Sequence, residues 1–473
     1  MISSKMRHLT SLRAIIFAFI VFSFIMLPIR NGYILRWYDE MSLFMTGGSF
    51  LHHMLHYPGG MLQYAGSWLT QFMYYPWLGS AILISLWVIA GLLNDRIWRL
   101  PEDMRGLSML PSLFLLVSVL VLDEAWVSIN YPGYLFAPTL GIISSLLIAG
   151  AARIISGVIW RGIFLTACTL LFMPLGFYAI LGIILGIIGM MPQFKRHKLS
   201  ASTIILVTLV AIIIVPQLYY YLYDGFAGDS RLLYLEGLPD FLMKKHDIYL
   251  WLPFAGIILS TLIQPAAAMT AKPLRAGRIM TCCVILASGC YGAVAGQKSE
   301  QFRATVLMMQ HIDTMRWDKI AYIMNHIKEP PTFTMKIIGN LARIKLGGGN
   351  EKVSHNPDDR NASPRHKEEF LMSAFVNVPV YYHLGNTHGS YRWAMEHTVK
   401  YGTRAFYLKY MVRNSIMHGE YELASRYNRL LLNTIFHRDW ARHFQRYIDN
   451  PELIKESREF NSIPRNPAET LFV

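Results

Sequence analysis

Two pairs of adjacent carboxylates are the residues best suited to chemistry in this chain. Asp39 and Glu40 follow shortly after a first apolar stretch, and Asp123 with Glu124 directly ends a later one. A charged side chain beside a membrane boundary is costly to bury, so such pairs need an explanation. A carboxylate partly removed from water has a raised pKa and can act as a general base toward a hydroxyl group. The alternative is that all four are ordinary solvated loop residues.

Basic residues near the same helix ends could hold a phosphate group. Lys and Arg bind phosphate oxygens through charge-assisted hydrogen bonds. The alternative is that they anchor helix ends at lipid headgroups, because long basic side chains commonly extend to the interface. The candidates are Arg36, Arg231, Lys244, Lys245 and His246.

The sequence predicts no metal-ligand set. His52 and His56 have the i, i+4 spacing of zinc sites, but no Glu lies between them as in HExxH, so histidines that face headgroups or water are favoured. The four cysteines all lie in apolar stretches and form no CxxC pair. The chain also has no phosphate-binding loop and no GxSxG motif, so nothing indicates nucleotide or serine hydrolysis.

The composition shows that a membrane protein must position these residues. Of the 473 residues, 53% are hydrophobic and only 16% are charged, against about 25% charged in an ordinary soluble domain. A soluble enzyme of this length is therefore excluded. The formal net charge of +14 could suggest nucleic acid, but the basic residues concentrate in loops on one side of the membrane. We therefore expect the lipid bilayer as a partner and no nucleic acid.

Nine windows are long and apolar enough to cross about 30 Å of hydrocarbon. They are residues 14–29, 69–93, 107–122, 133–151, 162–175, 177–192, 201–222, 249–268 and 279–297. The windows at 162–175 and 177–192 could instead form one broken helix or a re-entrant hairpin. Because basic residues favour the cytoplasmic side, their loop distribution indicates a cytoplasmic N-terminus. The outer short loops hold only Arg30, Arg36, Arg231, Lys244 and Lys245.

The predicted fold class is all-α, in two domains. Residues 1–298 are expected to form the polytopic domain, with an interfacial helix near 41–61. Residues 299–473 are expected to form helical hairpins on the outer side, with a flexible loop near 347–369. The stretch from His418 to Tyr427 resembles the helix-turn-helix of tetratricopeptide repeats. In it, a turn glycine is followed by Tyr, Ala and Tyr at spacings of three.

The acidic pairs after the first and third windows, the interfacial stretch and the C-terminal domain together resemble the C-superfamily of glycosyltransferases (GT-C). These polytopic enzymes transfer sugars from polyprenyl-phosphate carriers on the outer membrane face. The resemblance implies that Asp39 is the general base or orients the acceptor, that Glu40 is its neighbour, and that Asp123 with Glu124 forms a second acidic site. It also implies a lipid-linked sugar donor. No cofactor follows from the residues, and Mg²⁺ or Mn²⁺ is the candidate for such a transferase. The sequon-recognition motif of oligosaccharyltransferases cannot be placed in residues 299–473, so peptide glycosylation in particular is not expected.

A second resemblance covers nearly the whole chain. The pattern from Trp37-Tyr38-Asp39-Glu40 through Tyr57-Pro58-Gly59-Gly60 to Tyr75-Pro76-Trp77-Leu78-Gly79 resembles an uncharacterised membrane-protein family of Bacteroidota, which brings no assigned activity. We therefore expect an inner-membrane protein with a periplasmic C-terminal domain.

Two functions besides the transferase stay open. One is a non-catalytic, membrane-anchored helical-repeat scaffold for envelope assembly, with a protein partner for its C-terminal domain. The other is a transporter, which is disfavoured because ionisable residues in mid-span are almost absent.

Overall fold

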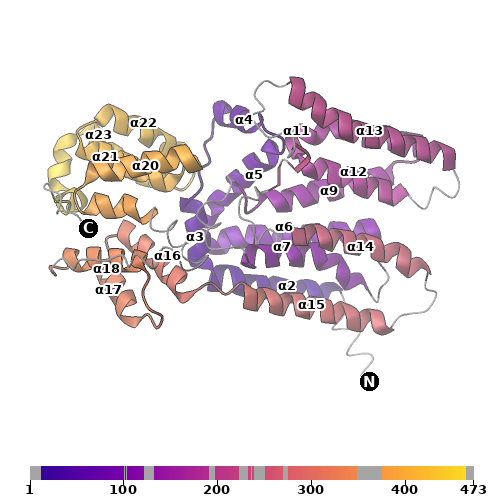
Figure 1. The fold of residues 1–473 in the computed structure, drawn as a ribbon, viewed down its shortest axis with the longest axis horizontal. Helices are drawn as coiled ribbons and strands as arrows, with labels where there is room; N and C mark the ends of the chain where they lie inside the picture. The colour runs from indigo at the N-terminus through magenta and orange to yellow at the C-terminus, as the bar shows by residue number, and fades with distance from the viewer. Residues whose placement is uncertain are drawn as a thin grey trace, which may run out of the picture. The chain divides into compact units, whose positions relative to one another are not determined.

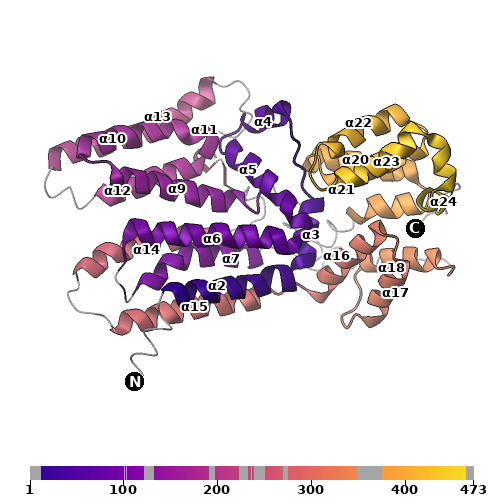
Figure 2. The same cartoon turned by 180° about the vertical axis from the view of Figure 1, so that it is seen from behind.

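The protein, seen here in a computed structural model, is all-α in its described residues (Figures 1 and 2). The described residues are 12–100, 102, 104–121, 133–190, 198–222, 233–235, 237–238, 251–269, 275–348 and 375–464, and none of them is in a strand. The chain divides into two compact units. The first holds Met1–Arg30, Gly47–Leu122 and Tyr131–Gln297, and the second holds Asn31–Thr46, Asp123–Asn130 and Lys298–Val473.

The first unit contains the membrane-compatible helices. In the described part of the chain, five segments have the length and composition to cross a membrane: Leu12–Arg30, Pro76–Trp98, Ala137–Ile154, Val158–Leu175 and Ser202–Leu222. Four apolar segments are shorter: Arg105–Val121, Phe177–Met190, Leu252–Thr261 and Cys282–Ala295. Each of the nine windows expected from the sequence overlaps one of these segments. The length and apolar composition of these helices indicate a helical membrane protein.

The described helices of the first unit include a series of apolar segments. In chain order they are α2 (Leu12–Phe24), η1 (Ile25–Arg30), α4 (Gly48–Met54), α5 (Gly60–Thr70), α6 (Pro76–Trp98), α7 (Leu110–Val121), α9 (Ala137–Ile154), α10 (Val158–Ala167), η4 (Cys168–Leu171), α11 (Phe172–Leu175), α12 (Phe177–Met190), α13 (Lys198–Leu222), α14 (Leu252–Met269) and α15 (Arg275–Ala295). Within the stretch 41–61, helix covers α4 and the first residues of α5. Figure 2 shows α6, α7 and α14 side by side, and these three helices contact one another.

Residues 162–190 form helical segments on either side of Gly176 and not one continuous helix. The chain reverses at Gly176, whose φ of 57° and ψ of −138° are accessible to glycine but strained for other residues. Leu165 and Cys168 before the turn and Ile183 after it share one buried apolar cluster.

Small residues let α9 and α12 approach closely. A Cβ atom on Gly141 would lie 2.4 Å from the ring of Tyr178. At the same crossing the Ser145 hydroxyl donates to the Tyr178 carbonyl at 2.6 Å. Small residues and interhelical hydrogen bonds are what hold helices together in lipid, where the hydrophobic effect between helices is weak.

The second unit is a helical domain around one buried helix. It contains α3 (Gly32–Glu40), α16 (Glu300–Asp313), α17 (Trp317–His326), α18 (Phe333–Lys345), a helix at 375–383, α20 (Thr387–Tyr401), α21 (Ala405–Met417), α22 (Tyr421–Leu432), α23 (Arg438–Asp449), η9 (Pro451–Glu456) and α24 (Arg458–Asn461). Every residue of α21 from Ala405 to Ile416 is buried. Because α21 packs against α3, α20, α22 and α23, its charged residues must find partners inside the domain.

Candidate functional site

The segment from residue 31 to 46 is built into the second unit, although about 250 residues of the first unit follow it in the chain. Its backbone pairs with the C-terminal helices. The Thr46 amide donates to the Asn433 carbonyl at 3.4 Å, and the Ala405 amide donates to the Ser42 carbonyl at 3.2 Å. The buried guanidinium of Arg404 donates to the Met41 carbonyl at 3.0 Å.

The amphipathic pattern of α3 decides which of its side chains face inward. Ile34, Leu35, Trp37 and Tyr38 are buried, and the Trp37 ring contacts the Phe406 ring edge-on at 5.5 Å. Arg36 is exposed on the opposite face. Residues one turn apart share a helix face, so the last turn of α3 carries its two carboxylates into the domain.

Asp39 faces a histidine from the start of α23. Its Oδ2 lies 3.3 Å from Nε2 of His437, and the two side chains are 2% and 5% exposed. Burial raises the pKa of Asp39 above its ordinary value, because the charged form loses its hydration, while the nearby imidazole acts in the opposite direction. The pair is therefore an acid and a base held together away from bulk water.

Glu40 is ion-paired with Lys409 of α21. Lys409 Nζ donates to both carboxylate oxygens at 2.7 Å. Burial alone would raise the pKa of Glu40, but the charge of Lys409 more than offsets this and lowers it. For Lys409, burial acts to lower the pKa, and the charges of Glu40 and Asp313 raise it overall. Both partners therefore stay charged.

Arg413, one turn further along α21, joins two more carboxylates. Its guanidinium lies 2.9 Å from Asp313 and 2.7 Å from Glu459. The Tyr382 hydroxyl donates to the same Glu459 carboxylate at 3.1 Å. Burial acts to raise the pKa of Asp313, but Arg413 and Lys409 bring it down to about 2. The Arg413 guanidinium also lies 5.3 Å from the ring centre of Trp440, a cation–π distance.

These side chains form one charge cluster with more carboxylates than cations. The charge cluster consists of Asp39, Glu40, Asp313, Glu459, Lys409, Arg413 and His437. The side chains of Asp39, Lys409, Arg413 and His437 are buried at its centre, whereas those of Glu40, Glu459 and Asp313 are 14%, 17% and 34% exposed. Four carboxylates lie beside two cations, Lys409 and Arg413, in this cluster. The donor atoms of Asp39, Glu40 and His437 lie within 4.8 Å of one another, so these three residues could hold a metal ion.

The structure brings some of the predicted site residues together and leaves others undescribed. Asp39 and Glu40 lie in the charge cluster, and Arg36 lies on the exposed face of the same helix. The remaining predicted residues lie outside the described part of the chain: Asp123, Glu124, Arg231, Lys244, Lys245 and His246. His52 and His56 of α4 contact each other with ring centres 4.4 Å apart.

Sequence reasoning missed the partners that the C-terminal helices supply. A basic residue on a helix normally lies on a solvated face, so Lys409 and Arg413 were not expected inside the domain, and nothing in the sequence singled out His437. The one available signal is that α21 is apolar on several sides around Lys409 and Arg413, which is unusual for a surface helix.

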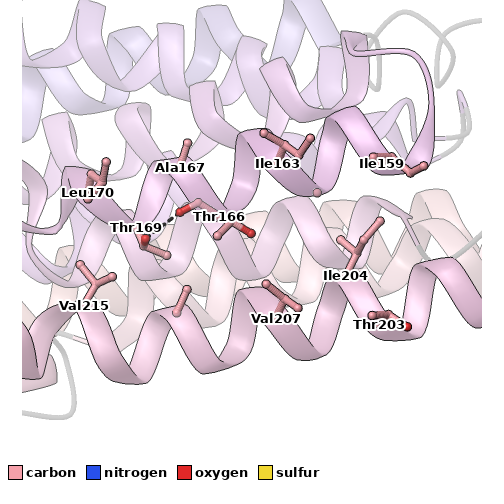
Figure 3. Close-up of a pocket in the computed structure, with 12 residues that line it drawn as sticks. Ile159, Ile163, Thr166, Ala167, Thr169, Leu170, Thr203, Ile204, Val207 and Val215 are labelled. Atoms are coloured by element: carbon pink, nitrogen blue, oxygen red, sulfur yellow. Dashed lines mark hydrogen bonds between the residues drawn. The ribbon is translucent and has the colours of Figure 1, made fainter.

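An apolar groove runs between α10 and α13 in the first unit (Figure 3). It measures about 580 Å³, and its lining includes Ile163, Leu170 and Val207. The Thr166 and Thr208 hydroxyls bond each other at 3.0 Å across the two helices. The Thr169 hydroxyl donates to the Thr166 carbonyl. Because these hydroxyls are already bonded within the protein, a hydrocarbon chain could fill the groove without stripping them of partners.

The sequence of the chain matches one known protein family over most of its length. The model of a family of unknown function (DUF6057) matches residues 7–469. No curated protein and no solved structure matches the chain.

Proposed function

The chain belongs to this DUF6057 family, and we propose that it is an integral membrane glycosyltransferase that moves a sugar from a lipid-linked donor to an acceptor on the periplasmic face. The observation that supports this most is the Asp39–His437 pair. The helix that carries Asp39 begins two residues after the first candidate span ends at Arg30. A buried carboxylate with a raised pKa beside an imidazole is the kind of pair that exchanges protons in acid–base catalysis.

In this proposal Asp39 takes the proton of an acceptor hydroxyl. The hydroxyl oxygen forms a bond to the anomeric carbon of the sugar, and the bond from that carbon to the donor phosphate breaks with its electron pair on the phosphate. His437 stabilises the charge on Asp39 before the reaction. Asp39 is only 2% exposed, so the proposal includes an opening of the contact with α23 that admits the acceptor.

The lipid part of the donor also has a suitable surface. The groove between α10 and α13 is apolar along its length, and both of its walls are candidate spans. A polyprenyl chain would replace bilayer lipid there without burying an unbonded polar group. This feature is consistent with a lipid-linked donor and does not identify the sugar.

We further propose nine membrane spans with a cytoplasmic N-terminus, in the inner membrane. Residues 31–46 and the C-terminal helices share buried ion pairs within one unit, so they must lie on the same side of the membrane. The number of crossings between Gly47 and Gln297 is then even. Four candidate spans fall in that interval, and the four shorter apolar segments make eight if all of them cross. The distribution of basic residues among the loops supports an outer position for the second unit. Its helix hairpins would act there as tetratricopeptide-like repeats.

A second candidate is the membrane-anchored scaffold for envelope assembly. The observation in its favour is that Lys409 occupies both oxygens of Glu40 and that Arg413 bridges two carboxylates. Ion pairs in which each charged group has a partner can have a purely structural role, in which they make the fold specific. In that case the second unit would bind a protein partner and no sugar would be transferred.

The glycan profile of cells that lack the protein separates the two candidates. Deletion cells are complemented at matched membrane abundance with the native chain, with Asp39→Asn, or with Asp439→Asn. Asp439 is a matched control because its side chain is 90% exposed on α23. The transferase proposal expects a surface glycan to vanish on deletion and to return with the native chain and Asp439→Asn but not with Asp39→Asn. An unchanged profile in the deletion cells would reject the transferase and leave the scaffold.

A further inference from the structure

One oxygen of Asp39 is buried without a hydrogen bond. Oδ2 accepts none from the described residues, although the side chain is 2% exposed. Most buried polar atoms in proteins are hydrogen-bonded, and an exception often marks a bound water or ion. Here the oxygen faces Nε2 of His437, an atom that can bind a metal when the imidazole is neutral.

The separation of these two atoms equals that of two ligands on one metal ion. Zinc binds imidazole nitrogen and carboxylate oxygen at about 2.0–2.2 Å in a tetrahedral arrangement, which places neighbouring ligand atoms about 3.3–3.5 Å apart. Asp39 Oδ2 and His437 Nε2 are 3.3 Å apart. The carboxylate of Glu40 supplies a third donor within 4.8 Å of both.

The electrostatics of the charge cluster favour a cation in the same place. Four carboxylates of the cluster face only two cations, Lys409 and Arg413. Charge without a partner is disfavoured away from water. A divalent cation among Asp39, Glu40 and His437 would add positive charge at the place where carboxylates are in excess.

We propose that Asp39, Glu40 and His437 bind one divalent transition-metal ion of the zinc class. A donor set of one imidazole and two carboxylates suits zinc, whereas Mg²⁺ and Ca²⁺ prefer oxygen ligands alone. Three protein ligands leave the fourth position of a tetrahedral site for water or a substrate oxygen. The metal site does not depend on sugar transfer and would stand if the chain proved to be a scaffold. With the ion bound, Asp39 is a ligand and not a free base, so in a transferase a water molecule on the fourth position of the ion would take the proton of the acceptor hydroxyl instead.

Lys409 is compatible with this ion as an outer partner of the site. Glu40 has two carboxylate oxygens, and Lys409 Nζ reaches both of them. One oxygen can turn toward the metal while the other keeps its bond to the ammonium group, which then orients the ligand. Hydrogen bonds of this kind from outside the first coordination shell are usual around protein metal sites.

The test is the zinc content of the purified full-length chain in lipid nanodiscs, after incubation with Zn²⁺ and removal of unbound metal. We expect about one zinc per chain in the native protein, and at least a tenfold lower content in His437→Gln and in Asp39→Asn. His443→Gln is the matched control, because His443 is exposed on the same helix, and it should bind zinc as the native chain does. Zinc content that is equal in the native chain and His437→Gln, or negligible in both, would overturn the proposal.

A second measurement on the native chain avoids the risk that a variant fails to fold. Co²⁺ in a tetrahedral protein site gives intense visible absorption bands, whereas octahedral Co²⁺ gives weak ones. We expect intense bands on titration with Co²⁺, saturation near one ion per chain and loss of the bands when Zn²⁺ is added. Weak bands only, or none, would overturn a tetrahedral metal site at Asp39, Glu40 and His437.

Discussion

Glu40 and Lys409 are 369 residues apart in the chain and form a buried ion pair in which both N–O distances are 2.7 Å. The pair joins the last turn of α3 to the central helix of the second unit. Because a charge left alone in such a place is strongly disfavoured, the segment 31–46 is a structural part of the C-terminal helical domain and not a loop beside it.

We expect the single variants Glu40→Gln and Lys409→Met each to destabilise the second unit by about 3–5 kcal/mol, because each leaves an uncompensated buried charge. The double variant should lose less than the sum of the two. The loss of stability is measured by unfolding the full chain in urea with a chelator present. The protease resistance of the second unit at each urea concentration reports how much of it remains folded. Glu422→Gln, which breaks an exposed pair with Arg426, should change stability by less than about 0.5 kcal/mol. Additive effects of the two buried variants would contradict a direct pair.

Asp39→Asn should leave folding and membrane insertion intact. Burial already disfavours the charged form of Asp39, so a neutral side chain of the same shape fits the site. The expected change in the free energy of unfolding in chelator is within about 1 kcal/mol, in contrast to Glu40→Gln. The check is the amount of folded protein in membranes and its protease resistance. Loss of folded protein would show that Asp39 is a structural carboxylate.

Acid should destabilise the second unit partly through Asp313. Its pKa is about 2 in the fold against an ordinary 3.8, so the unfolded chain binds this proton more readily. The contribution of Asp313 to stability is therefore present above pH 3.8 and is lost as the pH falls toward about 2. Asp313→Asn should unfold with a shallower pH dependence in this window. Matched unfolding curves of native chain and variant test this, and identical slopes would contradict it.

Gly141→Ala should loosen the packing of α9 against α12. The added Cβ would lie 2.4 Å from the Tyr178 ring, whose side chain is fully buried, whereas a Cβ on Gly289 of α15 meets nothing within 4 Å. Overpacking of this kind costs about 1–3 kcal/mol. Thermal unfolding in detergent should show a lower midpoint for Gly141→Ala and an unchanged one for Gly289→Ala. An unchanged midpoint in both would mean that α9 and α12 can shift apart freely.

The sequence by itself determined where the apolar helices of this protein lie. The apolar windows predicted helices at all nine positions. The hydrophobicity and length of a segment depend only on its own residues, and they are enough to favour a helix in a bilayer or a protein core. The position of this acidic pair shortly after the first apolar window also marked Asp39 and Glu40 as residues in need of an explanation.

Only the tertiary structure decided what those carboxylates contact. His437, Lys409 and Arg413 lie hundreds of residues from α3. The apolar neighbours of Lys409 and Arg413 suggest that these two are not solvated, but they do not say which carboxylates they contact. Their pairing depends on α3 packing against α21, which brings opposite charges together in a buried place where each needs the other. The meeting of Asp39, Glu40 and His437 follows from that packing and could not be read from spacing along the chain.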